Sequence, residues 1–170
     1  FSPDCVKVVL DGVPTESHTA AMLAPYVGHS HASEGDDKGM LMVAPAVLHP
    51  AMAAFDPEGL LIKFHAAGDA AVRAAIDSIA YARTVNGTGG QKHDVGHNSF
   101  VDPADIPRVR DLYMTWEFSP YIWYPTPIAA QDIRAAVGDQ RMERWIPIKD
   151  AVDTGALGVG GFDWSVVPSV

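Results

Sequence analysis

The stretch Leu60-Leu61-Ile62-Lys63-Phe64-His65-Ala66-Ala67-Gly68-Asp69 decides the fold class of this chain. It begins as a short, mostly apolar run that is typical of a β-strand, and it passes through a histidine into a Gly-Asp turn. After Asp69, apolar residues recur at helical spacing, and the acidic residue itself suits a helix N-terminus. The stretch therefore predicts a strand over 60–65 followed directly by a helix over 69–83.

Four further segments have the composition of strands, and they alternate with helical segments. The predicted strands cover 5–10, about 92–97, 113–118 and 157–163, and the other predicted helices cover about 44–57, a segment from 102, 127–144 and about 147–154. Strands that alternate with helices form βα units around a parallel sheet. The sequence thus predicts an α/β protein with five parallel strands and one domain over 1–170, with a long Gly-, Ser-, His- and Asp-rich loop over 11–40.

Composition and charge argue against several classes of function. The 170 residues carry a formal net charge of −9 and are 48% hydrophobic. An acidic chain without a basic patch is poorly suited to nucleic acid or to an anionic membrane surface. No apolar run approaches the ~20 residues that a transmembrane helix needs. Cys5 is the only cysteine, which rules out an intrachain disulfide and favours a reducing compartment, the cytoplasm.

Three predicted strands end in a residue that can bind a metal ion: His65, His97 and Asp163. Because the carboxyl ends of parallel strands lie on one side, where α/β barrels keep their chemistry, these side chains are expected to converge. Imidazole and carboxylate groups suit zinc and similar divalent ions, which lower the pKa of a bound water to about 7. Each histidine alone could instead bond locally, but two histidines and an aspartate at successive strand ends favour a metal site.

Lys7 and His93 are further candidates, each with two interpretations. Lys7 lies between Val6 and Val8 in an apolar strand, where a lysine is costly unless it is paired, deprotonated, modified or exposed at an edge. His93 precedes His97 by an even offset, so both rings can face the same way if the segment is extended. We therefore count His93 as a possible part of a substrate pocket.

Aromatic residues follow the last two predicted strands. Tyr121, Trp123 and Trp164 can wall a substrate pocket with their apolar faces, or they can pack over the mouth of the barrel. His29 and His31 have the His-x-His spacing of many metal sites. Because they lie in a loop without a supporting element, we interpret them as solvated.

Several segments, in order along nearly the whole chain, resemble the metal-dependent amidohydrolase superfamily, specifically amidohydrolase family 3, which includes N-substituted formamide deformylases. The matching segments are 6–12, 19–23, 64–72, 92–97, 118–125 and 161–166. The resemblance implies a (β/α)8 TIM-type barrel with one or two divalent ions, of which this chain supplies about strands four to eight. It implies that His65, His97 and Asp163 are metal ligands, with Asp163 also the acid–base group, and that Lys7 is where relatives can carry a bridging carboxylated lysine.

The sequence departs from the family pattern at several positions. Strands one to three are absent, and the His-x-His of strand one is absent with them. Gly96 stands where the family usually has Glu, Ala70 where it has Arg, and Phe162 where it has Ser. These changes alter positions that usually support the ligands and leave the three core groups in place.

The resemblance implies a metal-dependent hydrolase that cleaves a C–N bond of an amide-type, non-peptide small molecule through a metal-activated water. Five βα units cannot close an eight-stranded barrel, and open sheet edges are a liability. The missing strands are therefore expected from the rest of the protein or from another chain. Two alternatives stay open: a truncated, catalytically silent fragment that serves as a binding or assembly module, and a deaminase or esterase on the same barrel.

Overall fold

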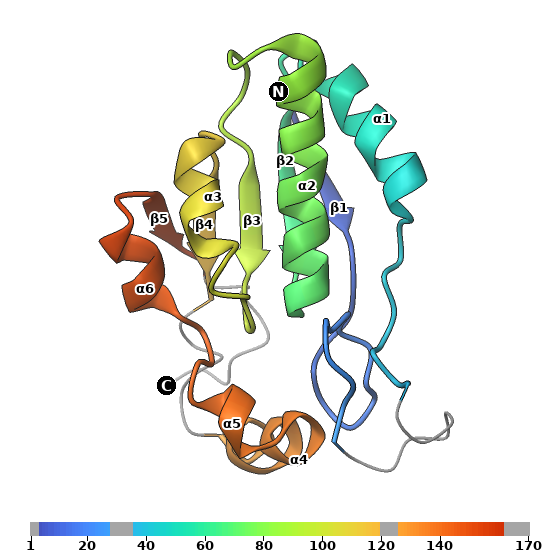
Figure 1. Ribbon diagram of the computed structural model, residues 1–170, viewed down its shortest axis with the longest axis vertical. Coiled ribbons are helices and arrows are strands. Elements are labelled where there is room, and N and C mark those ends of the chain that lie inside the picture. The colour runs from blue at the N-terminus through green and yellow to red at the C-terminus, as the bar shows by residue number, and fades with distance from the viewer. Residues whose placement is uncertain (1–3, 28–35, 120–125, 162–170) are drawn as a thin grey trace.

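Five parallel strands form a single sheet whose strand order follows the chain, as the sequence predicts. The computed structural model describes residues 4–27, 36–119 and 126–161 (Figure 1). The strands are β1 (Cys5–Val9), β2 (Leu61–Ala66), β3 (Asp94–His97), β4 (Thr115–Phe118) and β5 (Leu157–Gly160). Each strand hydrogen-bonds in parallel to the next one along the chain. All five carboxyl ends therefore lie at the same edge.

Four helices cover one face of this sheet, and a smaller helical group lies at the carboxyl edge (Figure 1). The covering helices are α1 (Pro45–Phe55), α2 (Asp69–Asn86), α3 (Ile106–Asp111) and α6 (Ile148–Asp153). The group at the edge consists of the π-helix η2 (Ile128–Ile133), α4 (Arg134–Val137) and α5 (Asp139–Met142). Among the described residues, no helix is long and apolar enough to cross a membrane.

The helical region predicted over 127–144 is present, and it is divided into three elements. It begins as a π-helix and is then interrupted at Gly138, whose φ of 82° lies in the left-handed region. A helix cannot continue through that conformation, and glycine adopts it without the steric cost that a side chain brings. The interruption turns α5 away from α4 beside the carboxyl edge.

The hydrophobic core lies between the sheet and the helices. Ile62, Phe64 and Ala66 alternate along β2 and are fully buried, and they pack with α2 residues that include Val72 and Ile76. Burial of one such large side chain contributes about 1.5–3 kcal/mol. This core fixes which residues of β2 point away from the helices, and His65 is one of them.

The other face of the sheet, here called the inner face, carries the alternate residues and is open in the described part of the chain. The strand registers align two rows across it, the first with Lys7, Lys63, Asp94, Thr115 and Leu157 and the second with Val9, His65, Gly96, Glu117 and Val159. At the outer strands Val9, Leu157 and Val159 are 43%, 50% and 42% exposed. Polar side chains therefore occupy the centre of the inner face and exposed apolar side chains flank them, as expected for the interior of a barrel opened along two edges.

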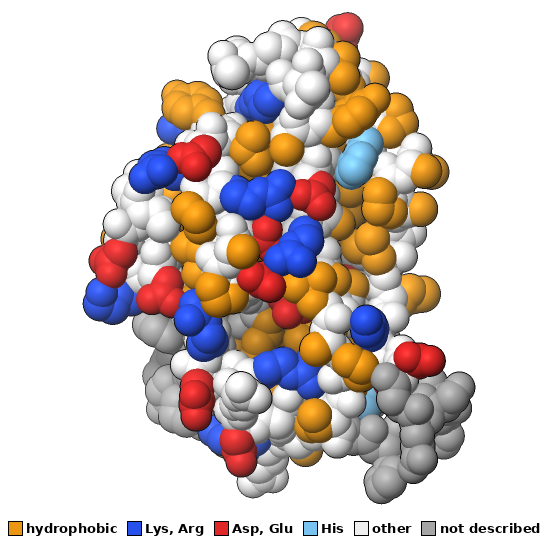
Figure 2. All heavy atoms as spheres, in the orientation of Figure 1, with side chains coloured by type: hydrophobic (Ala, Val, Ile, Leu, Met, Phe, Trp, Pro, Cys, Tyr) orange, Lys and Arg blue, Asp and Glu red, His pale blue; other side chains and the backbone are white. Residues whose placement is uncertain are grey.

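Charged residues pair across the helix-covered face, where Figure 2 shows basic and acidic side chains interspersed. Arg73 of α2 contacts Asp102 at 3.1 Å and Asp105 at 2.8 Å, while Arg108 of α3 contacts Asp105 at 2.8 Å and Asp77 at 2.6 Å. Asp105 is almost fully buried, so both guanidinium groups neutralise a carboxylate that would otherwise be costly to bury. The network joins the helices on either side of β3, the strand that ends in His97.

Candidate metal centre

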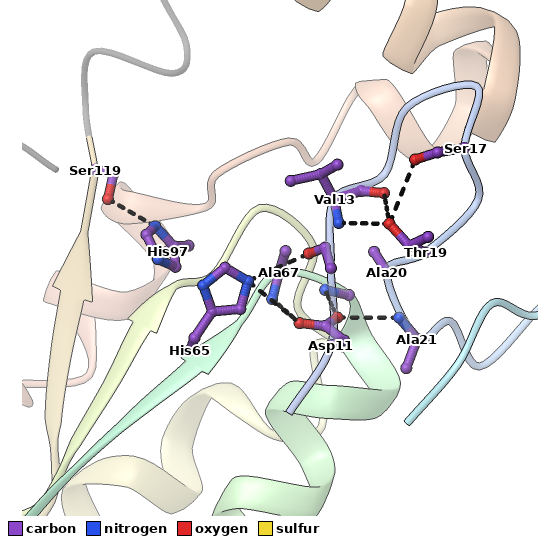
Figure 3. A network of polar contacts seen from close by, with 12 residues as sticks. Asp11, Val13, Ser17, Thr19, Ala20, Ala21, His65, Ala67, His97 and Ser119 are labelled. Carbon is purple, nitrogen blue, oxygen red and sulfur yellow. Dashed lines mark hydrogen bonds and ion pairs between the residues drawn. The ribbon is translucent and has the colours of Figure 1, made fainter. Parts of the chain in front are cut away.

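His65 projects from the inner face near the end of β2, and one of its ring nitrogens is already held. Its Nε2 lies 3.3 Å from the Gly12 carbonyl oxygen (Figure 3). Because a carbonyl oxygen only accepts hydrogen bonds, Nε2 carries the proton and donates it. In the neutral ring Nδ1 is then the nitrogen without a proton, and an unprotonated nitrogen is the one that binds a metal ion.

Asp11 holds the loop after β1 against the loop after β2. Its buried carboxylate accepts N–H bonds from Ala21 at 3.0 Å, Ala67 at 2.9 Å and Gly68 at 2.8 Å, and it lies 3.8 Å from His65 Nε2. Burial raises the pKa of Asp11, and the three N–H bonds and His65 offset part of that rise. The carboxylate thus fixes the backbone directly after His65 (Figure 3).

The ring of His97 lies beside the ring of His65 because the backbone at His97 has an unusual conformation. In a regular strand His97 would face the helices, as Val95 does. Instead His97 and Asn98 have φ values of 72° and 51°, in the left-handed region, at the end of the strand. The ring of His97 lies 4.4 Å from that of His65, centroid to centroid, with the planes at 61°.

Two neighbours support His97 in this conformation. Its Nδ1 lies 3.0 Å from Ser119 Oγ, so Nε2 is the nitrogen through which it would bind a metal ion. The Asn98 amide donates to the carbonyl oxygens of Val95 at 2.8 Å and Glu117 at 2.9 Å. Asparagine tolerates the left-handed region better than most residues, and these bonds hold it there.

The structure therefore brings together two of the three predicted ligands. Asp163 lies outside the described residues, as do Tyr121, Trp123 and Trp164. Within 4–27, 36–119 and 126–161, no group of three or more His, Cys, Asp or Glu side chains could hold a metal ion. Two adjacent imidazoles, each with one nitrogen held by a hydrogen bond, nevertheless fit a divalent ion such as zinc that takes further ligands from elsewhere.

His93 does not join this pair, and its assignment to the substrate pocket is corrected by its contacts. It precedes β3, at the opposite end of that strand from His97, and it is fully buried on the helix side. Its Nε2 lies 2.9 Å from Asp56 Oδ1, and its Nδ1 accepts an N–H bond from Ile62 at 3.1 Å. In a regular strand the even offset would place both rings on the same face. The left-handed backbone at His97 turns its ring to the other face, whereas His93 stays on the helix side.

Lys7 lies on the inner face of β1, opposite Val6 and Val8, as the alternation predicts. It is exposed, and its register partner on β2 is Lys63. This position is on the same face as His65, so a modified Lys7 remains compatible with a role near the candidate centre.

Four polar residues around the site were not singled out as candidates from the sequence. Asp11 and Ser119 each follow a predicted strand, and the rule that identified the histidines would have found them. Lys63 and Glu117 lie within apolar strands, three and one residues before the strand end. A charged residue inside such a strand is the only local signal for them, and their pairing depends on a contact across β3.

Comparison with known proteins identifies the family. The sequence model of the amidohydrolase family matches residues 1–169. This chain belongs to the amidohydrolase family. No curated protein matches the amidohydrolase chain.

Solved structures match this amidohydrolase chain in fold. An uncharacterized metal-dependent hydrolase from Pyrococcus furiosus has a TM-score of 0.75 at 22% identity, and one from Pyrococcus horikoshii OT3 has 0.77 at 23%. The ochratoxinase of A. niger has a TM-score of 0.54 at 14% identity, over 94% of this chain and 30% of that one. The Pyrococcus matches cover 96% of this chain and 31% and 30% of those chains. The chain thus spans about a third of the length of these proteins, and its fold is that of a partial TIM-type barrel, as predicted.

Proposed function

We propose that this amidohydrolase chain is part of a metal-dependent hydrolase that cleaves C–N bonds in amide-type, non-peptide small molecules. The observation that carries the proposal is the His65–His97 pair at the carboxyl edge of the sheet, with its ring centroids 4.4 Å apart. Hydrogen bonds to Gly12 and Ser119 orient both rings. The family and the two structurally similar metal-dependent hydrolases support this interpretation, and the N-substituted formamide deformylases are the proposed model for the substrate.

The proposed ligands of the metal ion, zinc in the first instance, are His65 through Nδ1, His97 through Nε2 and Asp163. Lys7, if carboxylated, would be a bridging ligand between two ions. A divalent ion in such a site polarises the substrate carbonyl and lowers the pKa of water. Residues 1–170 form a partial barrel domain in this proposal, and the remaining strands come from the rest of the protein or from another chain.

The chain's own groups have separate roles in the proposed reaction. The Asp163 carboxylate accepts a proton from the attacking water and returns it to the leaving nitrogen. Asp11 and Ser119 keep His65 and His97 in their orientations. Tyr121, Trp123 and Trp164 provide apolar walls for the small substrate.

Metal content tests the proposal directly. The protein, purified without chelators in the longest form that its gene encodes, should contain about one or two divalent ions per chain by elemental analysis. A His65→Ala/His97→Ala variant should lose them. A His49→Ala variant is the matched control, because the His49 ring stacks on Tyr81 on the helix side, away from the carboxyl edge.

The outcome also decides between the alternatives. Protein that folds but contains no metal would contradict the proposal and favour a silent binding or assembly module. If metal is bound, the products released from formamides, small amides, esters and amino-heterocycles distinguish an amidase from an esterase or a deaminase.

A further inference from the structure

We propose that the Lys63–Glu117 ion pair on the inner face is a positioning device for the candidate metal centre. The pair joins β2, which carries His65, to β4, and Glu117 also lies against Gly96, directly before His97, and against Gly161. Neither residue is proposed to touch substrate or metal. The effect on metal binding rests on the proposed function, whereas the effect on the two imidazole rings does not.

The ion pair reaches across a whole strand. Lys63 lies on β2, two residues before His65, and its Nζ contacts the Oε2 of Glu117 on β4. The side chains are 33% and 12% exposed, so the carboxylate is mostly shielded from water. β3 lies between the two strands, and the pair therefore passes over its inner side.

Gly96 provides the space for this crossing. It aligns with His65 on one side and Glu117 on the other, and it directly precedes His97. A Cβ atom at Gly96 would lie 3.2 Å from Glu117 Oε2 and 3.0 Å from the Phe64 carbonyl oxygen. Both contacts are tight for a carbon atom, so a side chain at this position would press on the carboxylate. Glu117 therefore lies against the backbone from which His97 emerges.

Gly161 provides the corresponding space on the other side. A Cβ atom there would lie 2.2 Å from Glu117 Oε1, which no real side chain could tolerate without displacing the carboxylate. The Gly161 N–H also donates to the Phe118 carbonyl oxygen at 2.7 Å. Because Gly161 precedes Asp163 by two residues, Glu117 contacts the start of the segment that carries the third proposed ligand.

Lys63 interacts electrostatically with two acidic side chains on the inner face, Glu117 and Asp94. Asp94 occupies the same row as Lys63 on the inner face. Burial and the negative charge of Glu117 raise the pKa of Asp94, and the positive charge of Lys63 lowers it. The charge of Lys63 thus offsets the repulsion between the two carboxylates, and its removal should displace Glu117.

Spectra of the histidine rings in metal-free protein test the proposal. Nitrogen-detected NMR reports the tautomer and hydrogen bonding of each imidazole, and alanine variants assign the signals of His65 and His97. Lys63→Met and Glu117→Gln should shift the signals of both rings, while the conservative Lys63→Arg should restore the wild-type spectrum. Lys149→Met is the matched control, because Lys149 pairs with Asp153 on the exposed surface of α6.

A variant that changes no charged residue distinguishes a positioning effect on the imidazole rings from a purely electrostatic one. Gly96→Ala leaves every charge in place and presses on Glu117, so it should also perturb the His97 ring. Gly89→Ala is its control, since a Cβ atom there would meet nothing within 4 Å. If zinc binds, the Lys63→Met and Gly96→Ala variants should lose about tenfold in zinc affinity, the lower end for residues that orient ligands.

The ring spectra test the positioning role of the ion pair, and the metal content tests the proposed function. Unchanged His65 and His97 ring signals in folded Lys63→Met and Gly96→Ala would overturn the positioning proposal, whether or not the protein binds metal. Wild-type protein that binds no metal would instead overturn the proposed function, and the ring spectra would still decide the role of the ion pair. Should Lys63→Met not fold, Gly96→Ala compared with Gly89→Ala decides it alone.

Discussion

The imidazole rings of His65 and His97 lie 4.4 Å apart because the two strand ends differ in conformation. His65 continues the regular alternation of β2, whereas His97 has a φ of 72° and leaves the alternation of β3. Without that change His97 would face the helices beside Val95, and the two rings would lie on opposite faces of the sheet. The pair thus depends on local backbone strain as well as on strand register.

Asn98 should lower the free-energy cost of this strained conformation. Asn98→Ala would place a less suitable side chain at φ 51° and would remove both amide hydrogen bonds, so we expect a loss of about 1–3 kcal/mol in the free energy of unfolding. Asn98→Gly removes the same bonds but adopts the conformation without steric cost. Urea denaturation should therefore rank the glycine variant between wild type and the alanine variant. A glycine variant less stable than the alanine variant would contradict this account.

Ser119 should affect metal binding more than stability. Ser119→Ala removes the partner of His97 Nδ1, 3.0 Å away, and leaves the ring less firmly oriented. We expect zinc affinity, measured by competition with a chelator, to fall about tenfold. Ser119→Thr keeps the hydroxyl and should retain most of the affinity. Equal affinities in the alanine variant and wild type would show that the hydroxyl does not orient the ring.

Asp11 should matter for both stability and the site. Asp11→Asn replaces one carboxylate oxygen by an amide N–H₂ group that cannot accept a bond, although both oxygens accept bonds in the native protein. We expect the free energy of unfolding to fall by about 1–3 kcal/mol. Asp139→Asn, at an exposed position, is the control and should change stability little. Urea denaturation of the two variants makes the comparison, and similar losses in both would argue against a special role for Asp11.

Acid should destabilise the protein through the buried His93–Asp56 pair. Burial lowers the pKa of His93, so in the unfolded chain this ring takes up a proton at a higher pH than in the folded protein. Hydrogen bonds from Arg83 and His93 lower the pKa of Asp56 and outweigh the rise that burial causes. Both shifts have the same sign for stability: the histidine contribution declines as the pH falls below about 6.5, and the aspartate contribution declines below about 4.

A His93→Gln variant isolates the first of these effects. It should be less stable than wild type at neutral pH, and its free energy of unfolding should decline less steeply between about pH 6.5 and 5. Denaturant midpoints at a series of pH values make the measurement. Parallel pH dependences for the two proteins would show that His93 does not contribute.

The sequence was a good guide wherever a feature depends on neighbouring residues. The five strands follow from short apolar runs, and α2 follows from its periodicity and from Asp69 at its start. Gly138 is a local signal for a break in the helical region predicted over 127–144, and the prediction did not use it. Its left-handed φ explains the interruption.

Features that depend on residues far apart along the chain could not be predicted. The face on which His93 lies depends on its contact with Asp56, and the face on which the His97 ring lies depends on the left-handed backbone at that residue. The partners of Glu117 lie on β2, β3 and the segment after β5. No pattern within a single strand predicts such contacts. Alternation shows which side chains of a strand share a face, but the packing of the helices decides which of the two faces that is.

The parallel topology also bears on the order in which the site assembles. A hairpin brings neighbouring strands together within a few residues, but here β1 can reach β2 only by closing the long connection over 10–60. Closing such a loop costs entropy before any contact offsets it, and sheets of this kind fold slowly for that reason. The bonds from Ala67 and Gly68 to Asp11 exist only once β1 has docked. We therefore expect the candidate centre to form only after β1 has docked against β2.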